Sequence, residues 1–235
     1  MITLYGFGEG FGLVDASPFV LKIDVYLRIA GLEFERKSDI ANLRNAPKGK
    51  LPYIVEGGKT IADSAFILDY LNSKPGVSLS SGLSPEQRAQ AYLIAKSLDE
   101  NLYWCLLYSR WIREQTWPLT RVTFFGSLPF PMRRVVPFIV RRSVRSAIYK
   151  QGLGRHSDSE IQQIFIYSLD SLSVLLGNKS YFFNDKPSVL DVCVFGFLAQ
   201  FILADIDNDF NDIARRYENL ASFCRNIHKR YYSQT

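Results

Sequence analysis

Short apolar runs and apolar positions at helical spacing alternate in the N-terminal part of the 235-residue chain. Met1–Gly6 is apolar and β-prone, which predicts a first strand. Ser17 and Pro18 then begin a helix, because serine is a favoured N-cap and proline a favoured first helical residue. The helix ends at a glycine, and Leu32–Lys37 predicts a second strand. The glycines between positions 6 and 12 lack the spacing of a dinucleotide fingerprint and indicate a flexible connection.

A hairpin and a further helix follow a short helical segment. Pro52 lacks an amide donor and suits the start of a strand, while Asp63 and Ser64 suit the start of a helix. Because a helix joins the first two strands, these are expected to be parallel. The predicted elements after Pro52 are a strand over Tyr53–Val55, a glycine turn over Glu56–Lys59, a return strand over Thr60–Ala62 and a helix over Ala65–Ser73.

Helical signals dominate the rest of the chain. Residues 74–84 are rich in Pro, Gly and Ser, which predicts a linker between an α/β domain over 1–73 and an all-helical domain over 85–235. Capping boxes open three predicted helices at Ser84, Ser157 and Ser188. The third of these helices is very apolar and is expected in the domain core.

Composition limits the classes of function. The chain is 47% apolar with a net charge of +5, which favours an anionic partner without indicating nucleic acid. No apolar run approaches the roughly 20 residues of a membrane span, and no secretory signal is visible, so a cytoplasmic location is expected. Three widely spaced cysteines (Cys105, Cys193 and Cys224) and two histidines predict neither disulfides nor a metal site.

Three short segments resemble the glutathione transferase family. They are Ser17–Val20 at the start of the first helix, Lys50–Pro52 at the start of a strand, and Asp63-Ser64 at the start of the third helix. In addition, the box Ser188–Asp191 is similar to the N-capping box of that family's core helix. The resemblance implies a thioredoxin-like N-terminal domain and a helical-bundle C-terminal domain.

Longer segments resemble the failed-axon-connections and metaxin-like branch of this family, which includes transferase-like proteins and membrane-associated import or adaptor proteins. The matching segments are Ser17–Lys22, Lys48–Ile54, Ile61–Ser64, Gln151–Ser157 and Asp185–Asp191.

The resemblance also implies a glutathione site. In the family, the proline at the position of Pro52 is cis. This isomer exposes the backbone of the preceding residue, here Leu51, so that the cysteinyl backbone of glutathione pairs with it as an added strand. The Lys50 ammonium would neutralise the glycyl carboxylate, and Asp63 and Ser64 would bind the γ-glutamyl end. The alternatives are an ordinary proline at a strand start beside a solvated lysine, and a plain helix cap.

Ser17 is the predicted catalytic residue. At a helix N-terminus its hydroxyl can donate a hydrogen bond to the glutathione thiolate, and the helix dipole adds positive potential. The alternative is that Ser17 serves only as an N-cap. Because Ser17 and Val20 stand where redox-type relatives carry cysteine, disulfide exchange is not expected. Tyr5 is expected to pack on the strand.

The implied function is conjugation of glutathione, as co-substrate, to a small hydrophobic electrophile. The alternative is a non-catalytic metaxin-like interaction or membrane-associated module on the same fold. A homodimer is expected from the resemblance alone. An aromatic stretch offers an electrophile pocket or a helical core, and consists of Tyr103, Trp104, Tyr108, Trp111, Phe124 and Phe125.

Arginines cluster between positions 121 and 145, interleaved with apolar residues. Such a segment can be a solvated helix face, an electropositive rim for anionic substrates, or a surface for anionic lipids. No nucleic-acid motif accompanies it. The residues assigned to possible weak contact with an anionic membrane are Arg133, Arg134, Arg141 and Arg142.

Overall fold

The protein is described from a computed structural model, which covers residues 1–183 and 185–232. Its N-terminal part contains a four-stranded sheet in the order β2-β1-β3-β4. As expected, β1 and β2 are parallel, whereas β1–β3 and β3–β4 are antiparallel. The strands are β1 (Ile2–Gly6), β2 (Phe34–Ser38), β3 (Tyr53–Glu56) and β4 (Lys59–Ala62).

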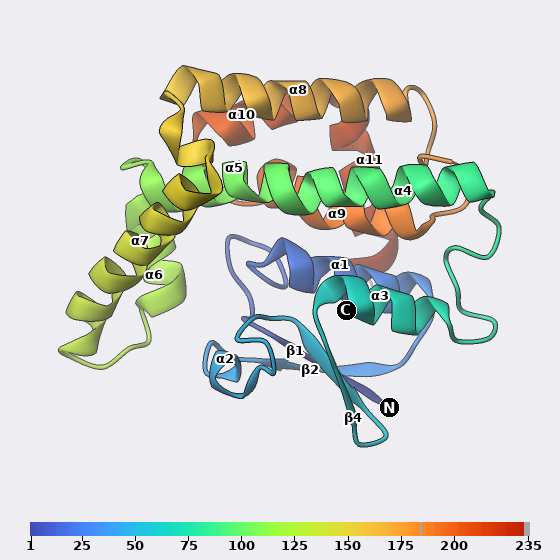
Figure 1. Cartoon of the computed structure of the whole chain (residues 1–235), viewed down its shortest axis with the longest axis horizontal. Coiled ribbons are helices and arrows are strands. Elements are labelled where there is room, and N and C mark those ends of the chain that lie inside the picture. The colour runs from blue at the N-terminus through green and yellow to red at the C-terminus, as the bar shows by residue number, and fades with distance from the viewer. Residues whose placement is uncertain (184, 233–235) are drawn as a thin grey trace.

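Helices connect and cover this sheet. Helices α1 (Pro18–Ile29) and α3 (Ser64–Asn72) lie between the sheet and the helical part of the molecule, while the short α2 (Asn42–Asn45) lies beside the end of the sheet, at the left of Figure 1. Gly57 and Gly58 form the β3–β4 turn with φ of +55° and +79°, a conformation that favours glycine. The element order is the thioredoxin-like order that the sequence predicts.

The remainder is helical, as predicted. Residues 85–112 form one nearly continuous helix that includes two π-helical turns, and residues 117–151 form a helical hairpin. No helix in the described residues is long and apolar enough to cross a membrane. The elements are α4 (Pro85–Ser97), η1 (Leu98–Leu102), α5 (Tyr103–Leu107), η2 (Tyr108–Ile112), α6 (Trp117–Phe125), α7 (Met132–Gln151), η3 (Leu153–Arg155), α8 (Asp158–Leu176), α9 (Val189–Ile202), α10 (Asp209–Arg215) and α11 (Glu218–Tyr232).

Helix α9 forms the centre of the core. Its residues from Leu190 to Ile202 are all buried, and α1 packs along it. Because α1 lies between the sheet and α9, it is buried on both sides, and even Lys22 and Asp24 are only 1% exposed. Gly196 permits this close approach, since a Cβ there would lie 2.9 Å from the Pro18 carbonyl oxygen. One continuous apolar core therefore joins the sheet to the helices.

The capping boxes hold two of the helix starts in the predicted way. The Ser84 hydroxyl accepts from the Gln87 amide while the Ser84 amide donates to Gln87 Oε1. The same exchange joins Ser157 and Glu160. Both boxes satisfy amides that the first helical turn leaves without an intrahelical partner.

The glycine-rich loop after β1 is folded, and the prediction of a flexible connection is wrong. The amide of Gly10 donates to the Leu13 carbonyl at 3.1 Å, and the Ala16 amide donates to the Gly8 carbonyl at 3.1 Å. Gly8 and Gly12 have φ of +106° and +73°, so these glycines supply turns in an ordered loop. The loop fixes the approach to α1.

Candidate functional site

A cavity of about 370 Å³ contains all the residues that the sequence analysis assigns to the glutathione site. They reach it from the α1 start, the segment before β3 and the β4–α3 junction. The predicted residues in its lining are Ser17, Lys50, Leu51, Pro52, Asp63 and Ser64. Their contact with glutathione stays a prediction, but the fold brings them to one place.

The Leu51–Pro52 peptide bond is cis, and both residues are buried. Pairing of β3 with β4 begins only at Tyr53. The Leu51 backbone forms no hydrogen bond with any other part of the chain that the structure describes. Its amide and carbonyl therefore remain available at the cavity wall, as pairing with an extended peptide requires.

Asp63 and Ser64 begin α3. Asp63 is the N-cap, and its Oδ1 accepts from the Ala65 amide at 2.9 Å. Its φ of +83° is unusual for a residue with a side chain, and such strain is concentrated at binding sites. Ser64 is 6% exposed, and its hydroxyl has no partner among residues 1–183 and 185–232. Capping and ligand binding are compatible here, because the cap uses only one carboxylate oxygen.

Ser17 is the N-cap of α1 and lines the same cavity. Its Oγ accepts from the Val20 amide at a long 3.4 Å. Within the described residues, no acceptor takes the hydroxyl proton, so this proton can be donated to a thiolate in the cavity. The helix start adds positive potential at the same point.

A buried carboxylate holds the backbone of Ser17 in place. Asp15 Oδ1 accepts from the Ser17 amide at 2.9 Å, and its Oδ2 accepts from the Gly8 amide at 2.8 Å. Arg110 and Gln200 brace the same loop from the helical part by donating to the Ala16 and Asp15 carbonyls. Burial raises the pKa of Asp15 from 3.8 to about 7, although its backbone hydrogen bonds act in the opposite direction.

This pKa shift predicts a pH-dependent stability. Since the folded-state pKa of Asp15 is above the unfolded value, the folded state binds more protons between pH 4 and 7. The free energy of unfolding should therefore fall as pH rises through this window, with a contribution from Asp15 of about 3 kcal/mol. Urea titrations at several pH values should show this fall in the wild type and a flatter profile in Asp15→Asn. Parallel profiles of the two proteins would contradict the assignment.

The cavity also contains residues that the sequence analysis did not assign to it. Lys48 lines the cavity together with Lys50, and its Nζ lies over the Phe66 ring, 4.3 Å from the ring centre. Phe7 contributes from the loop after β1. The sequence could have indicated Lys48 as a cavity residue, because it is a second basic residue two positions before Lys50. No local sequence pattern marks Phe7 as a cavity residue.

The aromatic stretch of the helical part divides between two roles. Tyr103 and Trp104 line the cavity, with the Tyr103 ring 4.8 Å from that of Phe19. Trp111 and Phe125 instead form a small separate core. The helical-core alternative therefore holds for Trp111 and Phe125, whereas an electrophile pocket at Tyr103 and Trp104 stays a prediction.

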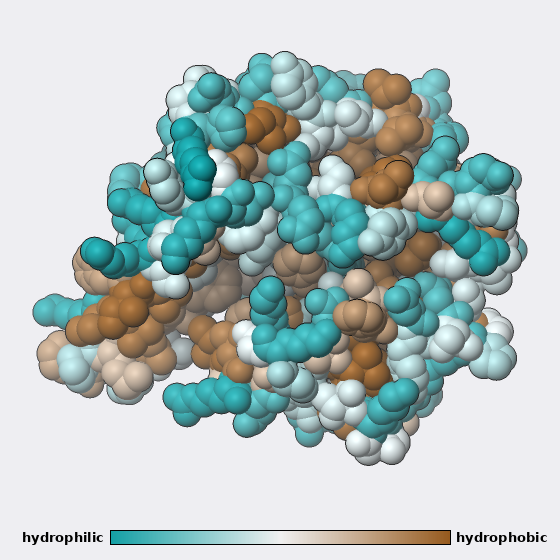
Figure 2. Space-filling model, in the orientation of Figure 1, coloured by the Kyte–Doolittle hydropathy of each residue, from teal (hydrophilic) through white to brown (hydrophobic). Residues whose placement is uncertain are grey.

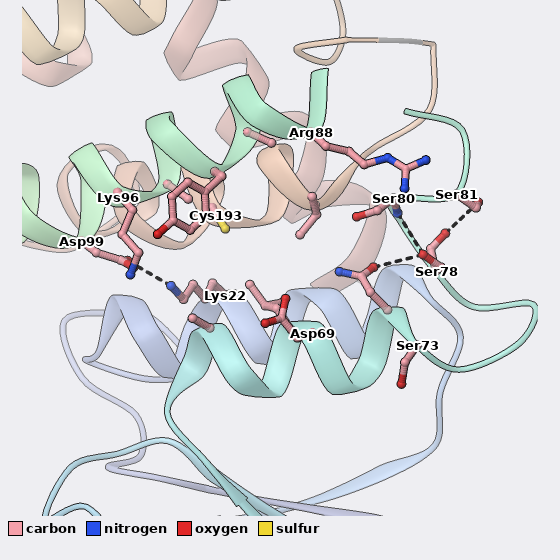
Figure 3. Close-up of a pocket in the computed structure, with 17 residues that line it drawn as sticks. Lys22, Asp69, Ser73, Ser78, Ser80, Ser81, Arg88, Lys96, Asp99 and Cys193 are labelled. Atoms are coloured by element: carbon pink, nitrogen blue, oxygen red, sulfur yellow. Dashed lines mark hydrogen bonds and ion pairs between the residues drawn. The ribbon is translucent and has the colours of Figure 1, made fainter. Parts of the chain in front are cut away.

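A second cavity, of about 480 Å³, lies between α3 and α4 (Figure 3). At its end nearest the predicted site, Lys22 Nζ lies 3.0 Å from Asp99 Oδ1, and Lys96 lies 3.9 Å from the other oxygen. Asp99 and Lys96 line both cavities, so this charged cluster separates them. None of the six predicted site residues borders the second cavity.

The cysteines offer no activated thiol. All three are buried, and burial raises the pKa of Cys105 to about 12 and that of Cys193 to about 11. The residues that the structure describes contain no group of three or more potential His, Cys, Asp or Glu metal ligands. None of the three cysteines lines the first cavity.

Comparisons with known families and structures agree with this architecture. Profiles of the glutathione S-transferase N-terminal and C-terminal domains match residues 18–116 and 166–227. The fold resembles the glutathione S-transferase of Ceriporiopsis subvermispora in complex with glutathione, with a TM-score of 0.69, 19% identity and coverage of 97% of this chain and 96% of that one.

The related proteins include both a glutathione S-transferase and members of the metaxin-like branch. The isoprene-epoxide glutathione S-transferase of Rhodococcus sp. (strain AD45) is 34% identical over 98% of this chain and 99% of its own length. Failed axon connections of Drosophila melanogaster is 32% identical over 85% of this chain and 50% of its own length, and human metaxin-2 is 28% identical over 94% and 84%. The chain belongs to the glutathione S-transferase family, with similarity to its metaxin-like branch.

Proposed function

We propose that this protein conjugates glutathione to a small electrophile at the first cavity. The observation that supports this most strongly is that Ser17, Leu51 and Ser64, from three separate segments, line one cavity. The basic side chains beside it suit an anionic tripeptide. The function of the Rhodococcus relative, named for an epoxide substrate, points the same way.

In the proposed complex each residue has one task. The Leu51 backbone pairs with the cysteinyl unit, and Lys50 neutralises the glycyl carboxylate. Asp63 accepts from the γ-glutamyl ammonium, while the α3 start receives the neighbouring carboxylate. Ser17 donates its hydroxyl proton as a hydrogen bond to the thiolate.

The reaction then consumes no reactant other than the two substrates, with water exchanging the protons. The thiol proton passes to solvent, and the Ser17 hydroxyl stabilises the sulfur anion. With an epoxide, sulfur forms a bond to carbon, the carbon–oxygen bond breaks, and the resulting alkoxide takes a proton from water. Phe7, Tyr103 and Trp104 provide the apolar wall for a small hydrophobic electrophile.

A direct test is isothermal titration with glutathione, followed by an assay of conjugation to a small aliphatic epoxide. Binding and product formation support the proposal. Binding without conjugation of any electrophile would limit the protein to glutathione binding. Absence of binding at millimolar glutathione would favour the second candidate, a non-catalytic interaction module, which the similarity to metaxin-2 supports. Homodimerisation and a cytoplasmic location stay predictions.

Replacing Lys50 by methionine is expected to weaken glutathione binding about fivefold. The change removes the charge but keeps most of the apolar stem, and an exposed charge contact contributes about 1 kcal/mol. Lys59→Met is the matched control, because Lys59 is also exposed but lies on the β3–β4 hairpin away from the cavity. Equal dissociation constants for the wild type and Lys50→Met would remove Lys50 from the site.

A further inference from the structure

One segment carries much more positive charge than the rest of the chain. Residues 115–157 contain eight Arg or Lys and no Asp or Glu, although the whole chain is only +5. The other residues together are therefore slightly acidic. Most of this segment is the α6–α7 hairpin, which projects from the body of the molecule at the lower left of Figure 1.

The same hairpin exposes large apolar side chains. Phe130 is 73% exposed, Phe138 69% and Ile139 63%. Figure 2 shows the resulting apolar area over α6 and α7, with hydrophilic residues around it. We call this area the hairpin patch; it consists of Leu119, Val122, Phe130, Met132, Val135, Phe138 and Ile139. Scattered exposed apolar residues are ordinary, but a contiguous group on a projecting element indicates an interaction surface.

The two sides of α7 have different roles. Val140, Arg141 and Val144 face the body, where Arg141 donates to the Trp111 and Ile112 carbonyls and pairs with Glu114. Because these contacts hold the guanidinium group against the body of the molecule, Arg141 is not a candidate for membrane contact.

The outer side combines apolar and basic residues. Val135, Phe138, Ile139 and Arg142 follow the i, i+3, i+4, i+7 spacing of one helix face, and all are exposed. Arg133, Arg134 and Arg142 form no ion pair in the part of the chain that the structure describes. These three arginines can therefore bind an external anion without first breaking an internal pair.

We propose that the hairpin patch is a docking surface for anionic membranes. Phe130, Phe138 and Ile139 would enter the boundary between headgroups and acyl chains, while the adjacent arginines bind lipid phosphates. A second copy of this chain fits less well, because a symmetric contact would place two patches of the same charge against each other. Nucleic acid would leave the apolar side chains exposed. None of the patch residues lines the first cavity, so the proposal does not depend on the candidate glutathione site.

Vesicle co-sedimentation tests this proposal. The wild type should sediment with vesicles containing about 30% phosphatidylserine, but not with pure phosphatidylcholine, and raised salt should release it. The variant Arg133→Gln/Arg134→Gln/Arg142→Gln should bind more than tenfold more weakly, since each arginine near an anionic surface contributes about fivefold. Phe138→Ser/Ile139→Ser should also lose binding by removing the apolar anchor.

Matched controls come from other faces of the molecule. Val174→Ser/Leu175→Ser removes exposed apolar residues from α8, and Arg225→Gln/Lys229→Gln removes exposed charge from α11. Both should bind vesicles like the wild type. The proposal is overturned if the wild type ignores anionic vesicles, if the control variants lose as much binding as the patch variants, or if Phe138→Ser/Ile139→Ser only converts a dimer to a monomer. Melting temperatures of all variants identify any that fail to fold.

Discussion

Replacing Ser17 by alanine is expected to lower kcat/KM for glutathione conjugation by about 10- to 100-fold. A hydrogen bond to a charged group contributes about 1.5–3 kcal/mol, and the Ser17→Ala protein would lack the hydroxyl that we propose stabilises the thiolate. The apparent pKa of bound glutathione should rise by about one to two units for the same reason. The pH dependence of kcat/KM, together with thiolate absorbance in the binary complex, measures both effects.

Loss of the helix cap must be separated from loss of catalysis. Removing the Ser17 side chain also removes the acceptor for the Val20 amide, which should cost about 1 kcal/mol of stability. Ser17→Thr keeps a hydroxyl and a good cap, so it should restore part of the activity and the lower thiol pKa. If Ser17→Ala loses stability but keeps its pH profile, Ser17 is only the cap.

Replacing Asp191 by alanine should destabilise the protein by about 5 kcal/mol, the largest stability effect expected from a single change. Asp191 is fully buried at the start of α9, where its carboxylate accepts from the Ser188 amide at 2.8 Å and the Phe182 amide at 2.9 Å. It also accepts from the Ser188 hydroxyl at 2.6 Å. Each buried donor left without a partner costs about 1–3 kcal/mol.

Equilibrium unfolding in urea at neutral pH measures this effect. Ser188→Ala is the graded control, because it removes the hydroxyl but leaves both backbone amides bonded to Asp191, and it should cost only about 1 kcal/mol. A typical domain has only about 5–15 kcal/mol of stability, so Asp191→Ala should be partly unfolded or insoluble at 37 °C. A loss no greater than that of Ser188→Ala would mean that the buried amides find other partners.

Much of the local structure could be predicted because its causes are local. A serine followed by proline begins α1, two glycines form the β3–β4 turn, and Ser84 and Ser157 cap their helices through residues three positions away. Such signals involve neighbouring residues, and the rest of the fold seldom overrides them. The resemblance to glutathione transferases added the architecture and the six site residues.

Packing between distant segments decided the remaining features. Phe7 and Lys48 line the cavity only because the loop after β1 and the segment before β3 meet there. Arg141 turns inward because Trp111 and Glu114 lie beneath it, although the sequence places it in a row of similar arginines.

The sequence by itself determined the order of the elements and their caps and turns, and its resemblance to glutathione transferases supplied the residues of a candidate glutathione site. The tertiary structure alone decided that α1 is buried on both sides, that the aromatic stretch divides between a cavity wall and a core, and which arginines face outward. The physical reason is that burial and electrostatic pairing depend on which surfaces meet, and residues far apart in sequence create those surfaces.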